Sequence, residues 1–215
     1  MALVLPFNNR SVHQILPDVQ QVLRTQGLLA VPTETYYGLS VRPTDEPALQ
    51  RLIEVKGRPP DKPILVLIAH RGQLAGLVES VPPAAAVLME SFWPGALTIV
   101  FPASPDLSPL LTAGTGTIGV RLSPLHTLTE LLEQTGPLTG TSANRSSDPP
   151  LDRAEDVQRM LGAAIDVILD GGQTPGGQAS TVVDARDQPR LIRDGATSTQ
   201  LIREALRRHG HTLSP

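Results

Sequence analysis

The chain has 215 residues, of which 40% are hydrophobic and 18% are charged, so it is long and apolar enough for one folded domain with a sizeable core. It contains no cysteine, which excludes disulfides, thiolate metal sites and cysteine nucleophiles. The formal net charge of −3 gives no global basic field for nucleic acid or a membrane, so any anion must be bound by a few placed cations.

Helix and strand signals interleave along the chain. In chain order we expect a helix ending at Gly27, a strand at 28–31, a helix beginning at 44–47, strands at 64–68, 97–101 and 117–122, helices at 125–134 and 152–161, strands at 167–169, 181–184 and 190–193, and a helix capped by Ser198 or Thr199. Within the 152–161 helix, Asp152 and Glu155 resemble a capping box. The order is not strictly strand-helix-strand. It therefore predicts a single α/β domain over 1–215, built on an open, twisted, mixed β-sheet flanked by helices.

No export or membrane signal is visible. The first ten residues, MALVLPFNNR, have no basic residue ahead of their short apolar run, unlike a secretory signal. Apolar runs such as 64–69 and 84–89 are far shorter than the ~20 residues that span a bilayer. We therefore expect a cytoplasmic protein without a membrane partner.

Familiar functional motifs are absent or out of context. Residues 114–119 match GxGxxG, but a strand-like segment follows where a dinucleotide-binding fold needs a helix, so a glycine-rich loop entering a strand is favoured. Residues 140–144 approach the GxSxG nucleophile elbow, but Asn144 is too large for its tight turn. There is no GxxxxGK[ST] phosphate loop. The five histidines show no HExxH pattern, and we expect no metal-ligating residues.

Three segments place polar residues where a plain core would not want them. Residues 32–38, PTETYYG, bring hydroxyls, a carboxylate and both tyrosines to the end of a predicted buried strand, where α/β sheets hold ligands. Residues 56–63, KGRPPDKP, carry three cations in a loop stiffened by prolines, which suits a polyphosphate. Residues 139–144, TGTSAN, offer small side chains that can bind a phosphate without crowding it.

In this order the segments resemble the YrdC-type threonylcarbamoyl-AMP synthase family. The family's PTETxYGL is here PTETYYGL at 32–39, its KxRP is KGRP at 56–59 and its SxN is SAN at 142–144. Further matches are FWPG at 92–95, VR at 120–121, STVVD at 180–184, and Arg193 followed by Gly195. The resemblance covers residues 12–206. The chain is similar to the family's short form, which lacks an extra C-terminal domain.

The resemblance implies a YrdC-like fold with a large concave cavity. It implies an enzyme, a nucleotidyltransferase, that condenses L-threonine, bicarbonate and ATP to threonylcarbamoyl-AMP and pyrophosphate with the help of Mg2+. The product would feed the machinery that makes the threonylcarbamoyl (t6A) modification at adenosine 37 of tRNA.

Carried over by position, the resemblance assigns residues to each substrate. Threonine would be held by Thr35, Arg121 and Ser180, the arginine gripping its carboxylate. The catalytic residues would be Lys56 and Arg58, and ATP would be held by these two with Lys62, Thr117, Ser142, Asn144 and Arg193. Leu67 stands where some relatives have a threonine-contacting histidine, and Tyr36 where an aliphatic residue is common.

Two alternatives stay open at this point. A related enzyme acting on another amine cannot be separated by sequence, and a difference of that kind would show at Leu67 and Tyr36. An RNA-binding module is disfavoured because only 3% of the residues are aromatic and the net charge is negative. A weak contact with tRNA through a local basic face is compatible with either reading.

Overall fold

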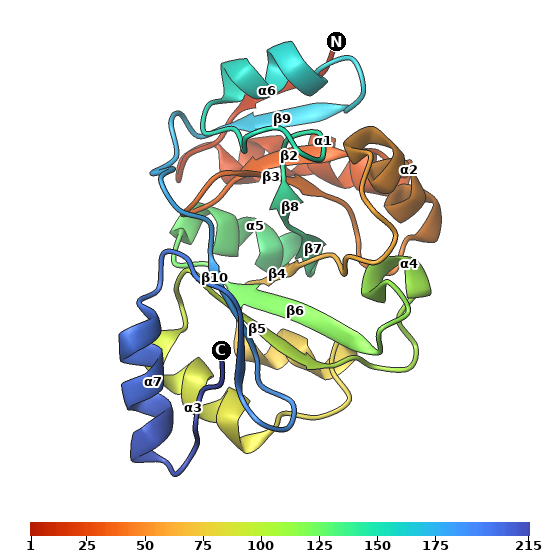
Figure 1. Ribbon diagram of the computed structural model, residues 1–215. Helices are drawn as coiled ribbons and strands as arrows, with labels where there is room; N and C mark the ends of the chain where they lie inside the picture. Colours follow the sequence, from red (N-terminus) through yellow and green to blue (C-terminus); the bar gives the residue numbers. More distant parts are fainter.

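The computed structural model describes residues 1–215 and arranges them as two mixed β-sheets flanked by helices (Figure 1). The helices are α1 (Val12–Arg24), α2 (Glu46–Lys56), α3 (Pro83–Phe92), α4 (Pro109–Thr112), α5 (His126–Thr135), α6 (Ala154–Leu161) and α7 (Thr199–Arg208), with a 3-10 helix at Arg71–Gly76. The strands are β1 (Leu3–Pro6), β2 (Leu29–Pro32), β3 (Tyr37–Ser40), β4 (Val66–Ile68), β5 (Leu97–Pro102), β6 (Thr117–Leu122), β7 (Leu138–Thr139), β8 (Thr141–Ser142), β9 (Val167–Asp170), β10 (Thr181–Asp184) and β11 (Arg190–Arg193). No helix has the length and apolar character that crossing a membrane requires.

The upper sheet in Figure 1 has the strand order β1-β9-β2-β3-β8. Strands β1, β9 and β2 run parallel, and β3 and β8 continue the sheet in antiparallel pairing. The turn between β2 and β3 contains residues 33–36, so the PTET segment lies at the end of a fully buried strand, as the sequence predicts.

The lower sheet has the order β11-β10-β5-β6-β4-β7. It mixes parallel pairs, β10 with β5 and β4 with β6, with antiparallel pairs, β5 with β6 and β10 with β11. Helices α3 and α7 pack together beside this sheet, and α1, beside the upper sheet, packs on α5, which lies between the two sheets (Figure 1). The mixed α/β class is confirmed, with the strands divided between two sheets.

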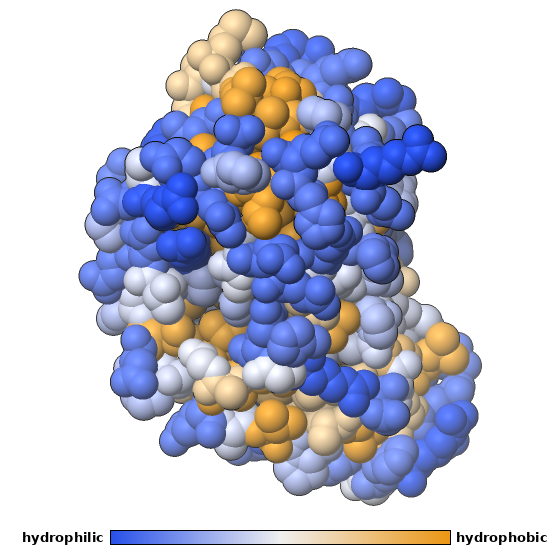
Figure 2. Space-filling view, turned by 180° about the vertical axis from the view of Figure 1, so that it is seen from behind, coloured by the Kyte–Doolittle hydropathy of each residue, from blue (hydrophilic) through white to orange (hydrophobic).

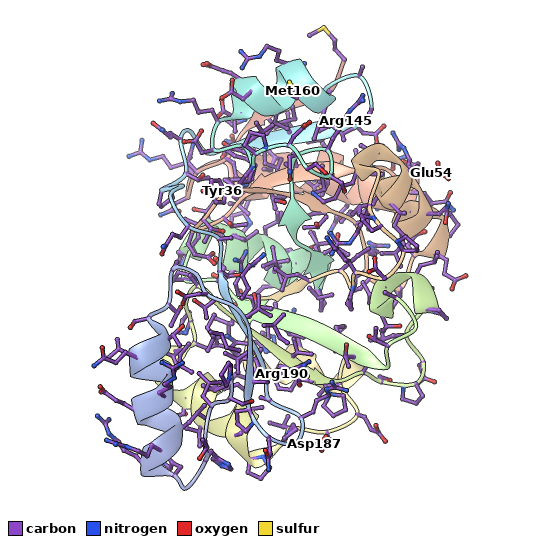
Figure 3. The ribbon with its side chains drawn as sticks, viewed as in Figure 1. Tyr36, Glu54, Arg145, Met160, Asp187 and Arg190 are labelled. Carbon is purple, nitrogen blue, oxygen red and sulfur yellow. The ribbon has the colours of Figure 1, made fainter.

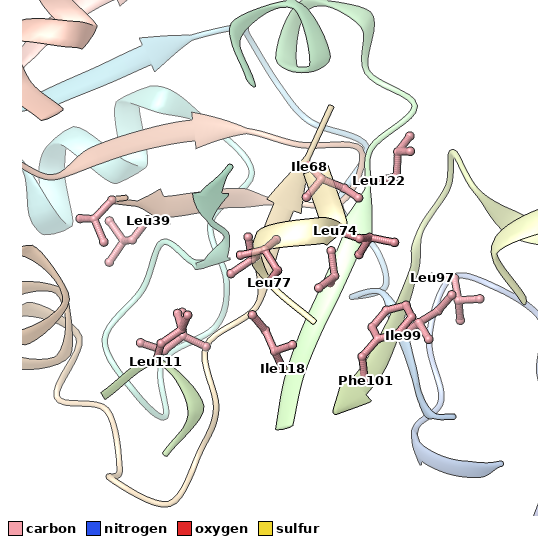
Figure 4. Close-up of a cluster of buried hydrophobic side chains, with 14 of the residues drawn as sticks. Leu39, Ile68, Leu74, Leu77, Leu97, Ile99, Phe101, Leu111, Ile118 and Leu122 are labelled. Carbon is pink, nitrogen blue, oxygen red and sulfur yellow. The ribbon is translucent and has the colours of Figure 1, made fainter. Parts of the chain in front are cut away.

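One hydrophobic core of 39 buried residues joins the two sheets. It takes in Leu39 of the upper sheet and Ile99, Phe101 and Ile118 of the lower one (Figure 4). Full burial of one such side chain stabilises the fold by about 1.5–3 kcal/mol, so this cluster holds the sheets in a fixed relation. A second cluster of 15 residues lies under α1 and α5.

Side chains cap α2 and α7, whereas α1, α3, α5 and α6 have no side-chain cap. Asp45 caps α2 by accepting a hydrogen bond from the Ala48 backbone at 3.1 Å, and Ser198 caps α7. The predicted capping box at Asp152 is wrong, because α6 begins after Arg153 and has no side-chain cap. The Asp152 carboxylate instead accepts a hydrogen bond from Gln173 at 2.9 Å, which ties it to the loop after β9.

The surface is mostly hydrophilic. Seen from behind, the hydrophobic residues that reach it form separate groups in the upper and lower halves, with hydrophilic side chains between them (Figure 2). The large hydrophobic side chains that are exposed are Met1, Leu3, Val4, Val81, Met160, Ile192 and Leu201. Ile192 is distinct in this set because it also lines the main cavity.

Candidate active site

A cavity of about 690 Å³ opens between the two sheets. Both sheets supply its walls, and only 7 of its 26 lining residues are hydrophobic. Its volume lies within the ~300–1,000 Å³ typical of small-molecule sites. The predicted site residues that line it are Thr35, Arg58, Thr117, Arg121, Ser142, Ser180 and Arg193.

Arg121 lies on β6 with its side chain only 3% exposed. Its Nε is 3.1 Å from Oε1 of Glu34, and its Nη1 donates to Oγ1 of Thr35 at 3.4 Å. Thr35 in turn lies 3.0 Å from the hydroxyl of Thr33. Burial lowers the pKa of Arg121 and Glu34 opposes that shift, but an arginine keeps its charge in a protein. The arrangement presents a buried guanidinium and two hydroxyls to the cavity, which suits a carboxylate.

Ser180, which precedes β10, and Arg193, at the end of β11, line the same cavity as Arg121. Arg193 donates to the carbonyl oxygen of Ser180 at 3.0 Å and to its hydroxyl at 3.1 Å. The same hydroxyl lies 2.9 Å from that of Thr98. Burial, and then repulsion from Arg121, lower the pKa of Arg193. Two arginines that repel each other across a cavity favour an anion between them.

Arg58 is fixed at the opposite wall by three hydrogen bonds. It donates to the carbonyl oxygens of Lys62 at 3.0 Å and Pro63 at 2.6 Å, and to the hydroxyl of Thr141 at 3.0 Å. The proline-stiffened loop therefore orients the guanidinium through its own backbone. Lys62 contributes only that carbonyl, and its side chain is exposed and does not line the cavity.

Lys56 stands behind the cavity wall. Its ammonium donates to the carbonyl oxygens of Ser142 at 2.6 Å and Asn144 at 3.0 Å, and to Oδ1 of Asn144 at 3.0 Å. Burial, and then the charge of Arg58, lower the pKa of Lys56 to about 8. Lys56 and Asn144 do not line the cavity, whereas Ser142 does. The structure therefore places Lys56 and Asn144 as supports of the segment that carries Ser142.

Gly140 allows that segment to approach β4. A Cβ at this position would meet the side chain of Leu67 at 2.6 Å, closer than side chains tolerate. Leu67 belongs to the second hydrophobic cluster and does not line the cavity. Tyr36 does line it, at the edge shown in Figure 3. Of the two positions at which a substrate difference was expected to show, Tyr36 lines the cavity and Leu67 does not.

Sequence reasoning missed three residues on the cavity wall, Asp184, Arg186 and Arg190. Arg186 forms two hydrogen bonds to the Asp184 carboxylate, at 3.0 and 2.8 Å. Burial raises the pKa of Asp184, but these bonds outweigh it and hold the pKa below its usual range. Arg190 lies at the rim, 57% exposed and 4.0 Å from the same carboxylate (Figure 3). The signal was available, because STVVD ends a predicted strand with a carboxylate and basic residues follow.

The cavity is cationic although the chain is acidic. Arg121 is paired with Glu34, and Arg186 and Arg190 share Asp184, which leaves Arg58 and Arg193 outside any ion pair. Positive charges held together with few negative partners raise the local concentration of anions. The geometry suits two anionic groups, a carboxylate at Arg121 and a phosphate chain along the remaining arginines.

The metal-binding side chains near the cavity determine how a Mg2+ ion could be held. No group of three or more His, Cys, Asp and Glu side chains is placed to hold a metal ion. The carboxylate on the cavity wall, Asp184, is bound by Arg186. Mg2+ keeps several waters and takes much of its coordination from substrate phosphates. A Mg2+ ion at this site would therefore be held largely by phosphate groups of a ligand and by water.

Known proteins match this chain over most of its length. The family model Sua5_yciO_yrdC, described as "Telomere recombination", matches residues 21–195. The chain is 41% identical over 193 residues to the threonylcarbamoyl-AMP synthase of Bacillus subtilis, covering 86% of this chain and 56% of that protein. It is 39% identical over 181 residues to a putative threonylcarbamoyl-AMP synthase of Mycobacterium tuberculosis, covering 83% of both chains. The chain thus spans little more than half of the Bacillus subtilis protein.

Solved structures show the same fold. A Pyrococcus abyssi Sua5 complexed with L-threonine superposes with a TM-score of 0.87 at 32% identity, covering 100% of this chain and 62% of that one. Escherichia coli YciO superposes with a TM-score of 0.82 at 24% identity, covering 93% and 98%, which supports the fold alone. By its sequence match and its architecture, the chain belongs to the Sua5/YciO/YrdC family.

Proposed function

We propose that the protein is a threonylcarbamoyl-AMP synthase, which converts L-threonine, bicarbonate and ATP into threonylcarbamoyl-AMP, pyrophosphate and water. The observation that carries the proposal is one cavity with two anion sites, the buried Arg121 fork and the unpaired arginines Arg58 and Arg193. Relatives at about 40% identity bear this name, and Sua5 of Pyrococcus abyssi has been solved with L-threonine.

In the first step, bicarbonate takes up a proton and loses water to give CO2, which the amine of threonine attacks. A C–N bond forms, the amine loses a proton to solvent, and N-carboxy-threonine results. Arg121 holds the α-carboxylate during this step, and the hydroxyls of Thr35 and Ser180 orient the amino acid. Holding the reactant in place removes much of the entropic cost of the encounter.

In the second step, the new carboxylate attacks the α-phosphorus of ATP. A P–O bond forms to the carbamate oxygen, the bond to the β-phosphate breaks, and pyrophosphate leaves. Two anions must meet, so Arg58 and Arg193 stabilise the charge that gathers on the phosphates. Bound Mg2+ supplies further charge neutralisation when ATP brings it.

Lys56 and Asn144 act on this reaction through Ser142. Their hydrogen bonds fix the 142–144 segment, so the Ser142 hydroxyl is held ready for a phosphate oxygen. Thr117 completes the phosphate side of the cavity. We assign Lys62 a backbone role alone, since its carbonyl orients Arg58. The product would pass to the enzymes that transfer the threonylcarbamoyl group to tRNA.

The experiment that tests the proposal is mass spectrometry of the products formed from ATP, bicarbonate and a panel of amino acids. We expect threonylcarbamoyl-AMP from L-threonine and pyrophosphate in equal amount. A different acyl-adenylate as the main product would assign another amine substrate. Salt-sensitive RNA binding with no amino-acid-dependent release of pyrophosphate would instead support a binding module.

A further inference from the structure

Glu34 is an acidic residue at the active site to which the reaction steps above assign no task. It lies in the turn between β2 and β3, between the two threonines that face the cavity. Its carboxylate turns to Arg121, with Oε1 3.1 Å from Nε, and its side chain is 12% exposed. Glu34 does not line the cavity, whereas Arg121 does.

The Glu34 carboxylate is itself held from behind. Its Oε2 accepts a hydrogen bond of 2.5 Å from the hydroxyl of Ser123, a residue with no exposed surface. The Ser123 oxygen accepts in turn from the backbone N–H of Leu125 at 3.2 Å. This chain of contacts runs from the backbone of the loop after β6 to the guanidinium, and it anchors one edge of Arg121 to the scaffold.

Glu34 contacts the Nε edge of the Arg121 guanidinium, and the opposite edge remains available to a ligand. A guanidinium has donors on Nε and on both Nη atoms, and a carboxylate can use either side. Nε faces Glu34, while Nη1 reaches Thr35 at 3.4 Å on the cavity side. The Nε and Oε1 atoms are buried and are not aligned for a hydrogen bond, so the contact between them is an ion pair alone. A second carboxylate therefore has the Nη end available to it.

We propose that Glu34 is a positioning residue, which holds Arg121 by its Nε edge so that the Nη end faces the α-carboxylate of the amino acid. The inference rests on the proposed function for the identity of that amino acid. A free arginine side chain loses considerable rotamer freedom when it grips a ligand, and Glu34 removes that cost beforehand. It also supplies the charge that a buried arginine needs while the cavity is empty.

The first test compares Glu34→Gln and Ser123→Ala with wild type in pyrophosphate release, with threonine and ATP varied separately. For Glu34→Gln we expect the KM for threonine to rise about tenfold, with kcat and the KM for ATP within about twofold of wild type. Ser123→Ala should shift the threonine KM in the same direction by less. Glu54→Gln on the exposed face of α2 is the matched control and should change nothing (Figure 3).

A double-mutant cycle separates positioning from a structural role. If Glu34 acts through Arg121, then Glu34→Gln introduced into an Arg121→Lys background should change the threonine KM by less than about twofold. Additive losses in the cycle would overturn the inference. Circular dichroism checks that each variant is folded. If Glu34→Gln does not fold, the threonine KM of Ser123→Ala tests the inference, and an unchanged KM would overturn it.

Calorimetric titration with L-threonine distinguishes this inference from the proposed function. Binding to wild type without turnover would overturn the function, and weaker binding to Glu34→Gln would still support the positioning role. Turnover by wild type with unchanged threonine affinity in Glu34→Gln would overturn the positioning role alone. Absence of threonine binding to wild type would overturn both.

Discussion

The ammonium of Lys56 donates to the backbone carbonyl of Asn144 at 3.0 Å, joining the end of α2 to the segment after β8 across 88 positions of the chain. Three further acceptors on Ser142 and Asn144 surround the same nitrogen within 3.3 Å. The sequence predicts that Lys56 binds ATP, but its ammonium instead donates to acceptors on Ser142 and Asn144. We therefore assign Lys56 the role of holding the 142–144 segment in place.

Replacing Lys56 should therefore release the 142–144 segment. We expect Lys56→Ala to lower kcat/KM for ATP by about two orders of magnitude or more, because Ser142 and its neighbours lose their anchor. The variant should stay folded by circular dichroism. Pyrophosphate release near the wild-type rate would refute the role.

Arg58→Ala removes a charge that lines the cavity directly. We expect it to lower kcat by about 100-fold or more, since the charge on the phosphates grows in the transition state. Arg24→Ala, on the exposed end of α1, serves as the control for loss of an arginine. An Arg58→Ala enzyme that differs from wild type only in the KM for threonine would contradict the assignment.

Stability should rise with pH through the titration of Lys56. Its pKa of about 8 in the folded protein lies below the ordinary lysine value of 10.5, so the unfolded chain binds more protons between these values. The cost of burying the charged ammonium is fully present below pH 8 and declines above it. Between pH 7.5 and 9.5 we expect wild type to gain about 1–2 kcal/mol relative to Lys56→Met, measured by urea unfolding. Equal pH dependence in the two proteins would contradict the shift.

The contact between Gly140 and Leu67 can be tested by adding one methyl group. Gly140→Ala should destabilise the protein by about 1–3 kcal/mol, because the new Cβ would overlap the leucine side chain. Adding Leu67→Ala should recover part of the loss caused by Gly140→Ala, compared with Leu67→Ala alone. The check is the unfolding midpoint of the four proteins, and simple additivity would show that the two residues do not clash.

Much of the fold follows from local signals in the sequence. Helix α2 begins where an acidic cap and Pro47 predict it, and β6 follows the glycine-rich loop that resembles a dinucleotide motif. Strand β3 was not predicted, because residues 32–38 were interpreted as the polar segment that ends the 28–31 strand. Whether strands form one sheet or two depends on pairing between distant residues, such as Gly38 with Ser142, and no local pattern encodes it.

The site could be predicted in composition but not in geometry. The family motifs singled out Arg58, Arg121 and Ser142, and all three line the cavity. The direction in which Lys56 points depends on the fold of a segment some ninety positions away, so the motif alone could not reveal that it serves the backbone. Arg186 lies on the cavity wall in the β10–β11 hairpin, whose pairing is local, so the predicted strands at 181–184 and 190–193 could have indicated it.

The most direct test of the account is a crystal structure of the protein with L-threonine and a non-hydrolysable ATP analogue. We predict the threonine carboxylate on the Nη end of Arg121 and the triphosphate along Arg58, Ser142 and Arg193, both in the cavity between the sheets. Either ligand bound outside that cavity, or threonine bound with its carboxylate away from Arg121, would contradict it.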